Sequence, residues 1–232
     1  MKILKPSEQK RELDYLVTGV SRSGTVYMAK LLTSLGFPCT HEAVFTPYGF
    51  KNASKTNSAV SIHDGPWLNN TDKIVAESSY MGAPHVKSLR CLRETKVIHL
   101  IREPLRVVFS ILDGFNYFQH SHPDNDPYQT FIYVHVPDLT QDLDPVSRAC
   151  LFYMEWNEMI EKQNPDFVYH VESDVELLAE FLGVEANNYF QNRRANSRSN
   201  GFSHTHDDIP EGPIKDRFIE MSKRYGYTII SA

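Results

Sequence analysis

The feature that most constrains this fold is a strand, a short polar loop and a helix that follow one another near the N-terminus. An apolar strand is expected at 15–20 and an amphipathic helix at 25–35, with Gly36 as its stop signal. The loop between them runs Ser-Arg-Ser-Gly-Thr from Ser21 to Thr25. Loop N–H groups and the positive end of a helix dipole converge at such a junction, so the segment predicts an anion site of phosphate size.

The order of residues in this loop distinguishes it from the loop of nucleotide-hydrolysing proteins. Arg22 stands where those proteins carry Lys, and it precedes Ser23-Gly24-Thr25 instead of following a second glycine. The loop therefore indicates that a nucleotide phosphate is bound, but not in the manner of an ATPase. Taken alone, the same five residues are also compatible with an ordinary turn between strand and helix.

Apolar runs and helical patterns alternate along the rest of the chain, which is typical of a parallel sheet with crossover helices. The predicted fold class is therefore α/β, a three-layer sandwich around a central parallel sheet. A short strand can follow the last helix. Further strands are expected at 37–40, 73–76, 96–101 and 167–171, and further helices at 84–93, 104–112, 145–163, 175–182 and 213–225.

Length and composition favour one domain over residues 1–232, with irregular excursions at 47–70, 114–144 and 191–208. A formal net charge of -5 argues against broad nucleic-acid binding. No segment approaches the roughly 20 apolar residues of a membrane span, so we expect neither a signal peptide nor an anchor. The three cysteines are scattered, which favours reduced thiols and a cytoplasmic location.

A second motif lies at the clearest predicted strand, 96–101. This strand delivers Arg102 to its carboxyl end, where ligands bind in open α/β sheets. Ser110 follows eight residues later on the next helix. Arg102 offers a planar fork of donors suited to phosphate, and Ser110 offers a hydroxyl. The alternative is that Arg102 forms a salt bridge at the helix start with Glu103.

Together the two motifs resemble those of the sulfotransferase family, which uses 3′-phosphoadenosine 5′-phosphosulfate (PAPS). The family's first motif holds the 5′-phosphosulfate, and its second motif grips the 3′-phosphate through Arg102 and Ser110. The resemblance covers roughly residues 15–184 and implies a fold similar to that of P-loop NTPases, with 3′,5′-ADP as product and no metal ion. The first motif is matched by Arg22, Ser23, Gly24, Thr25 and Val26.

The resemblance also implies a role for each matched residue. Arg22 would stabilise the charge that builds on the bridging oxygen as the sulfuryl group leaves. Backbone N–H groups from Ser23 to Val26 and the Thr25 hydroxyl would hold the 5′-phosphate. The cytosolic branch of the family has Lys in place of Arg22, whereas the tyrosylprotein-modifying branch and many bacterial members have Arg, so the difference does not argue against activity.

An acceptor must also lose a proton, and the sequence offers several bases. Glu42 is the first candidate, because the tyrosylprotein branch has a Glu at nearly this separation from its catalytic Arg; His41 is the second and His85 a weaker third. His41 and Glu42 can equally be a polar pair that caps a strand. Glu77 can pair with Arg22, orient the acceptor or form a structural salt bridge.

The remaining polar clusters keep two interpretations each. Arg193 and Arg194, in the basic run 191–198, can cover the 3′-phosphate or form a solvated loop; the Arg-Lys-Gly signature of the cytosolic branch is absent. The two His-x-His pairs, at His120 and His204, have no third-ligand pattern, so no metal site is predicted. Aromatic residues in 114–144 can line an acceptor pocket or cover the core.

The function predicted is transfer of a sulfuryl group from PAPS to a hydroxyl or amine of a small-molecule, carbohydrate or peptide acceptor. A small-molecule kinase of the P-loop class is the alternative. It predicts Gly-Lys-Ser/Thr at the end of the first loop, which is missing here. A non-catalytic protein that retained the nucleotide pocket is the third hypothesis, and it predicts binding without transfer.

Overall fold

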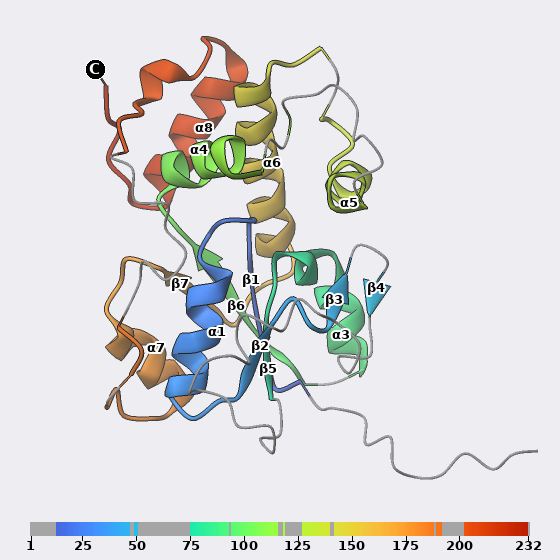
Figure 1. The fold of residues 1–232 in the computed structure, drawn as a ribbon, viewed down its shortest axis with the longest axis vertical. Coiled ribbons are helices and arrows are strands. Elements are labelled where there is room, and N and C mark those ends of the chain that lie inside the picture. The colour runs from blue at the N-terminus through green and yellow to red at the C-terminus, as the bar shows by residue number, and fades with distance from the viewer. Residues whose placement is uncertain are drawn as a thin grey trace, which may run out of the picture.

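The computed structural model describes residues 13–46, 49–50, 75–92, 94–115, 118, 127–139, 142–187, 189–191 and 202–231 (Figure 1). These residues form a five-stranded sheet in the order β2-β5-β1-β6-β7, and each neighbouring pair is parallel. The strands are β1 (Tyr15–Gly19), β2 (Cys39–His41), β5 (Ala76–Ser78), β6 (Lys96–Ile101) and β7 (Phe167–His170). The predicted α/β class with a central parallel sheet is confirmed.

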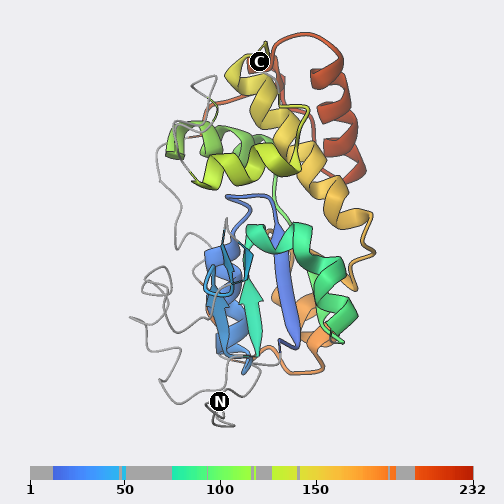
Figure 2. The same cartoon turned by 90° about the vertical axis from the view of Figure 1, so that its right-hand side faces the viewer.

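Helices cover both faces of the sheet, which gives the predicted three layers (Figure 2). Successive residues of a strand point to opposite faces. Val17 accordingly packs with α1 (Thr25–Ser34) and α7 (Val175–Leu182) in one core. Leu16 packs in a second core with the 3₁₀ helix η3 (Tyr80–His85) and with α3 (Val86–Leu92).

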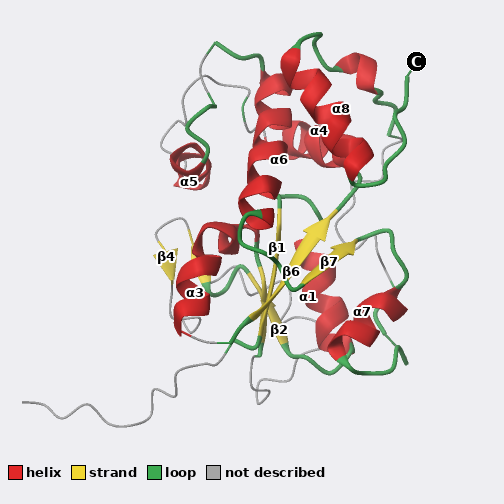
Figure 3. Cartoon of the chain, turned by 180° about the vertical axis from the view of Figure 1, so that it is seen from behind, coloured by secondary structure: helices red, strands yellow, loops and turns green. Residues whose placement is uncertain are grey.

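A group of helices lies beyond the carboxyl edge of the sheet. It consists of α4 (Pro104–Phe115), α5 (Pro127–His135), α6 (Pro145–Glu161) and α8 (Pro213–Arg224). Figure 3 shows the arrowheads of β6 and β7 pointing toward this group. Trp156 on α6 is fully buried and belongs to the core, as predicted. Residues that follow parallel strands therefore collect at the boundary between the sheet and these helices.

Local sequence signals explain where several elements begin and end. Asp144 caps α6 by accepting hydrogen bonds from the backbone N–H groups of Val146 and Ser147. Gly183 ends α7 in the left-handed conformation, at φ 71°. The expected strand 96–101 and helix 175–182 have the predicted bounds.

Several expectations about elements are wrong. The excursion 114–144 contains α5, and residues 227–230 form no strand after α8. The strand expected at 73–76 lies at Ala76–Ser78, because Glu77 and Ser78 pair in register with β1 and β2 although both are polar. The 3₁₀ helix η3 precedes the helix expected from 84. The Ser79 hydroxyl oxygen caps the start of η3 by accepting a hydrogen bond from Met81 N–H.

Smaller elements complete the description. A two-stranded antiparallel hairpin joins β3 (Phe45–Thr46) to β4 (Gly49–Phe50), so part of the 47–70 excursion is a strand. A short 3₁₀ helix, η4 (His206–Asp208), precedes α8. Cys39 and Cys150 are buried free thiols. None of the helices described here combines the length and apolar character needed to cross a bilayer.

Candidate functional site

The loop between β1 and α1 folds back tightly on itself. The backbone N–H and the hydroxyl of Ser23 both donate to the carbonyl of Val20, at 3.1 and 2.6 Å. Arg22 and Gly24 take left-handed conformations, at φ 72° and 102°. A left-handed backbone is strained for a residue with a side chain, so Arg22 is held there by its surroundings. A Cβ on Gly24 would lie 3.2 Å from Val171, which explains the glycine.

The N-terminus of α1 keeps the properties of an anion site. Within the described part of the chain, no side chain caps this helix at Gly24. The first N–H groups of an α-helix have no acceptor inside the helix, and the helix dipole places positive charge there. The N–H groups of Thr25 and Val26 therefore remain available to an anion beside the Arg22 loop.

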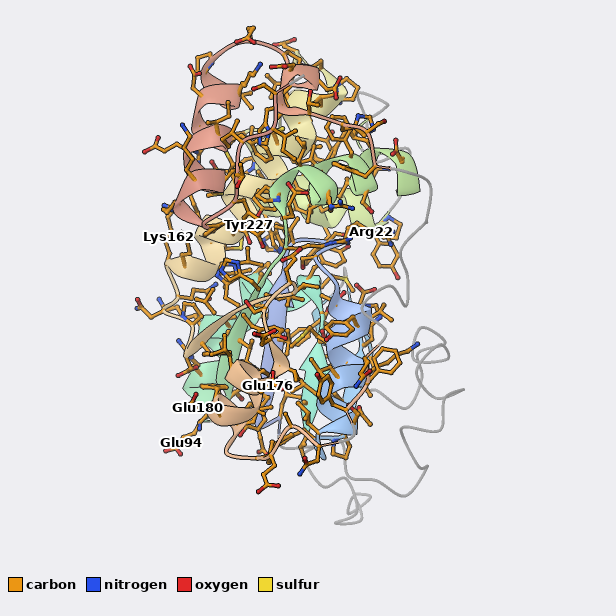
Figure 4. All side chains as sticks on the ribbon, turned by 90° about the vertical axis from the view of Figure 1, so that its left-hand side faces the viewer. Arg22, Glu94, Lys162, Glu176, Glu180 and Tyr227 are labelled. Atoms are coloured by element: carbon orange, nitrogen blue, oxygen red, sulfur yellow. The ribbon has the colours of Figure 1, made fainter. Side chains whose placement is uncertain are left out.

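The structure brings the two sequence motifs together. The Arg22 Nε–H donates to Ser110 Oγ at 2.9 Å, and Arg102 Nη1 donates to the carbonyl of Arg22 at 3.0 Å. A Cβ on Gly114 would lie 3.8 Å from Arg22 Nε, so this side chain runs along one face of α4. Figure 4 shows Arg22 at the boundary between the sheet and the upper helices. Side chains that are 80 to 88 residues apart thus surround one loop.

Arg102 is partly buried at this boundary. Burial lowers its pKa, and Glu172 opposes that effect most strongly, since its charge favours the guanidinium cation. The predicted alternative partner, Glu103, instead caps α4 by accepting from Leu105 and Arg106 N–H. Arg106 also pairs with the Glu103 carboxylate at 3.6 Å. The helix-start salt bridge of Glu103 is therefore made with Arg106.

The two candidate bases lie at the carboxyl end of β2, beside the start of α1. His41 Nε2 and Thr25 Oγ1 share a hydrogen bond of 2.9 Å, and His41 Nε2 lies 3.8 Å from Glu42 Oε1. Burial lowers the pKa of His41 to about 4 and raises the pKa of Glu42 to about 7. At neutral pH the imidazole is neutral while the carboxyl group titrates. Glu42 also has a left-handed backbone, at φ 51°.

Glu77 has a different environment from those that the sequence suggested. It is fully buried, and it accepts hydrogen bonds from the Thr40 hydroxyl and from the N–H groups of Ala43 and Val44, the latter two at 2.8 and 3.2 Å. Burial, together with the charge on Glu42, raises its pKa to about 7 against the effect of these hydrogen bonds. Glu77 therefore accepts hydrogen bonds from the turn after β2 and does not form the predicted ion pair with Arg22.

Sequence reasoning missed a polar network on the other side of Arg102. The Tyr227 hydroxyl donates to Glu172 Oε2 at 2.8 Å and lies 3.2 Å from His170 Nδ1. Glu172 Oε1 accepts from Glu103 N–H at 3.2 Å. Glu172 follows β7 much as Arg102 follows β6, and that position was the available signal. Tyr227 carried no such signal, since it lies after the last helix.

Some of the other predicted site residues lie outside the residues that the structure describes. Arg193, Arg194 and the pair at His120 lie outside the described residues. His204 stacks on Phe109 of α4, at 3.7 Å between ring centroids. His85 packs among aromatic rings, with the Phe45 centroid at 5.7 Å. Across the described ranges, no three His, Cys, Asp or Glu side chains are grouped as metal ligands.

Comparisons with known proteins give a likeness of fold and no match of sequence. No protein-family model matches the chain, and no curated protein matches its sequence. Among solved structures, a sulfotransferase from Alicyclobacillus acidocaldarius is similar, with a TM-score of 0.46 and 11% identity over 92% of each chain. The strand order and the parallel register of the five-stranded sheet define the fold. Fold and site define a three-layer α/β protein in which Arg22 and Arg102 meet at one helix N-terminus, at the carboxyl edge of a parallel sheet.

Proposed function

We propose that this protein is a sulfotransferase that moves a sulfuryl group from PAPS to a hydroxyl or amine acceptor. The observation that carries the proposal is the contact between the two motifs, in which Arg22 bonds to Ser110 and Arg102 bonds to the Arg22 carbonyl. A donor with two separate phosphate groups needs two cationic sites a short distance apart. These three residues supply such sites at one helix start.

The proposed donor would be bound at both phosphates by residues of this boundary. The N–H groups from Ser23 to Val26 and the Thr25 hydroxyl would hold the 5′-phosphosulfate. Arg102 and Ser110 would hold the 3′-phosphate, for which a guanidinium fork is well suited. Arg193 and Arg194 stay candidates for covering that phosphate.

The chemistry assigned to Arg22 follows from where charge develops. An acceptor oxygen or nitrogen attacks sulfur as the bond from sulfur to the bridging oxygen breaks, and that oxygen leaves on 3′,5′-ADP. Sulfuryl transfer resembles phosphoryl transfer, with a loose in-line transition state. A cation fixed beside the bridging oxygen stabilises the transition state more than the ground state. The strained backbone of Arg22 and its bond to Ser110 hold this cation in place, which supports the proposed role.

Glu42 is the proposed general base. A base works best when its pKa lies near the operating pH, and burial raises the pKa of Glu42 to about 7. His41 is the weaker candidate, because burial lowers its pKa to about 4. The neutral His41 would instead hold the Thr25 hydroxyl beside the helix start. The acceptor proton passes to the Glu42 carboxylate as the new bond to sulfur forms.

Ligand-dependent stability tests this function. A ligand that binds only the native state raises the apparent melting temperature by mass action. We expect 3′,5′-ADP to raise it, ATP with magnesium to leave it unchanged, and Arg102→Ala to abolish the 3′,5′-ADP effect. Stabilisation by ATP alone would favour a kinase and contradict the proposal. An acceptor screen with PAPS then separates an enzyme from a protein that only binds the nucleotide.

A further inference from the structure

The turn that carries Glu42 crosses from one face of the sheet to the other above a buried carboxylate. Thr40 and Glu77 are register partners in adjacent parallel strands, as are Leu16 and Glu77, so their side chains share one face. His41 pairs in register with Ser78 and reaches Thr25 on the opposite face. The chain then turns at Glu42 and passes over Glu77.

Both carboxyl oxygens of Glu77 accept hydrogen bonds from this turn. Oε1 accepts from the N–H groups of Ala43 and Val44, and Oε2 accepts from the Thr40 hydroxyl. These three donors lie on both sides of Glu42 in the sequence. The left-handed backbone of Glu42 costs energy and persists only because interactions of its surroundings hold it. A buried N–H group without an acceptor is also costly, so the turn depends on this carboxyl group.

We propose that Glu77 is a positioning residue that fixes the turn at 40–44 and acts on Glu42 through its charge. The proposal rests on the role proposed above for Glu42, but its physical content can be measured without turnover. Glu77 has no direct contact with the acceptor in this proposal. It holds the base in place and makes its ionisation depend on a second carboxyl group.

Two further titratable groups, Cys39 and His41, lie close to the two acids. Among the described residues, Glu42 and the Cys39 thiol act electrostatically with Glu77, and His41 lies 3.8 Å from Glu42. The pKa of Cys39 is raised well above its ordinary value by burial and by Glu77. Burial holds His41 neutral near pH 7. The pKa values of Glu42 and Glu77 both lie near 7, so the interaction between these two acids varies between pH 5 and 8.

Thr40 lets the turn keep its hydrogen bonds in both charge states of Glu77. When Glu77 is ionised, the Thr40 hydroxyl donates to Oε2. When Glu77 is protonated, its own O–H can donate to Thr40 Oγ1, while Oε1 still accepts from Ala43 and Val44. Glu77→Gln reproduces the protonated arrangement, with the amide N–H toward Thr40. This variant removes the charge and keeps the turn.

The test is a carbon-13 NMR titration of the side-chain carboxyl groups, with the Glu42 signal assigned by its loss in Glu42→Gln. In the wild type, two coupled acids should each show two inflections. In Glu77→Gln, the Glu42 midpoint should move down by about one pH unit, because a nearby negative charge has been removed. Glu180→Gln is the control, since Glu180 is exposed at the far end of the lower helices (Figure 4).

Two further variants keep the proposal open to contradiction if Glu77→Gln fails to fold. Thr40→Val removes the hydroxyl that stabilises ionised Glu77, so Glu77 should titrate at higher pH and Glu42 at lower pH. Glu77→Ala removes both acceptor oxygens, so maximal turnover should fall and Gln should restore it. An unchanged Glu42 midpoint in folded Glu77→Gln or Thr40→Val, or single independent inflections in the wild type, would overturn the proposal.

The same measurements separate this proposal from the function itself. A moved Glu42 midpoint without turnover of any acceptor supports the link between the two acids and contradicts the assigned reaction. Turnover of an acceptor with an unchanged Glu42 midpoint supports the assigned reaction and contradicts the link between the two acids. Where both hold, the acidic limb of the kcat/KM profile of Glu77→Gln should move with the NMR midpoint, a change that a purely structural role would not produce.

Discussion

Arg22 is the side chain whose removal should matter most to transfer. Arg22→Ala is expected to lower kcat roughly a hundredfold to a thousandfold, the usual effect of removing one fixed donor from a developing charge. Arg22→Lys should keep part of the rate, because it retains the cation but loses the planar fork. Steady-state kinetics measure both.

The matched control is Arg106→Ala. Arg106 is an exposed arginine on α4 that pairs with Glu103 and lies over the Phe202 ring. Its loss changes the net charge equally, and we expect kcat to stay close to that of the wild type. An equal decrease of kcat in Arg22→Ala and Arg106→Ala would contradict a specific role of Arg22 in transfer.

Glu42 should impose a pH dependence on transfer. As the proposed base, Glu42 would act as the carboxylate, and burial raises its pKa to about 7. The rate should therefore rise with pH and level off above about 7. Glu42→Gln should lower it roughly a hundredfold to ten-thousandfold and abolish that limb. A rate that is independent of pH between 5 and 8 in the wild type would contradict Glu42 as the base.

Site residues could be predicted from sequence where a strand end carried a distinctive side chain. Arg22 and Arg102 follow buried strands, and parallel strands end at one edge, so their proximity was foreseeable. The partnership of Glu77 with Thr40 was not foreseeable. It depends on the register between two short strands, and a three-residue strand has no periodicity from which register can be read.

The approach of β1 to β6 gives a prediction about a whole element. A Cβ on Gly19 would lie 2.2 Å from the carbonyl oxygen of Leu100 and 2.7 Å from Ser23 Oγ. Gly19→Ala should force β1 and the loop from Ser21 to Thr25 away from β6, at a cost of about 1–3 kcal/mol or more. Urea denaturation measures this loss, and weaker binding of 3′,5′-ADP should accompany it.

Gly36→Ala provides the comparison. Gly36 has φ 95° but nothing within 4 Å of an added Cβ, so only backbone strain of about 1–2 kcal/mol is expected there. Nucleotide binding should not change. A Gly19→Ala variant no less stable than Gly36→Ala would show that the strands can separate without cost.

Helices and strands could be predicted from sequence where their residues are buried along the whole element or along one face of it. Strand β6 and helix α7 have such patterns, and their bounds were predicted correctly. Helix α5 was missed because it leaves apolar Val134 exposed while Phe131 is buried, which obscures the helical period. Strand β5 was misplaced because polar Glu77 and Ser78 lie inside it, fully buried, with their hydrogen bonds supplied by neighbouring segments.

The stability of the folded protein should depend on pH through two opposing sets of buried groups. The pKa of His41 falls from 6.5 to about 4, and burial also lowers the pKa of His99. Below about 6.5 the unfolded chain binds protons that the native state excludes, so stability decreases on acidification. The pKa values of Glu42 and Glu77 rise from 4.5 to about 7. Between these values the unfolded chain ionises first, so these acids lower stability as pH rises.

Glu77→Gln separates the two sets of groups. Without the Glu77 carboxyl, the free energy of unfolding should rise more steeply with pH between 4.5 and 7 than in the wild type. The difference between the two curves should grow by at most about 3 kcal/mol, since each unit of pKa shift corresponds to about 1.4 kcal/mol. Urea denaturation at pH 5 and pH 7.5 measures it, with Glu180→Gln as control. Parallel curves for Glu77→Gln and the wild type would mean that Glu77 is ionised throughout, as its three hydrogen-bond donors alone would favour.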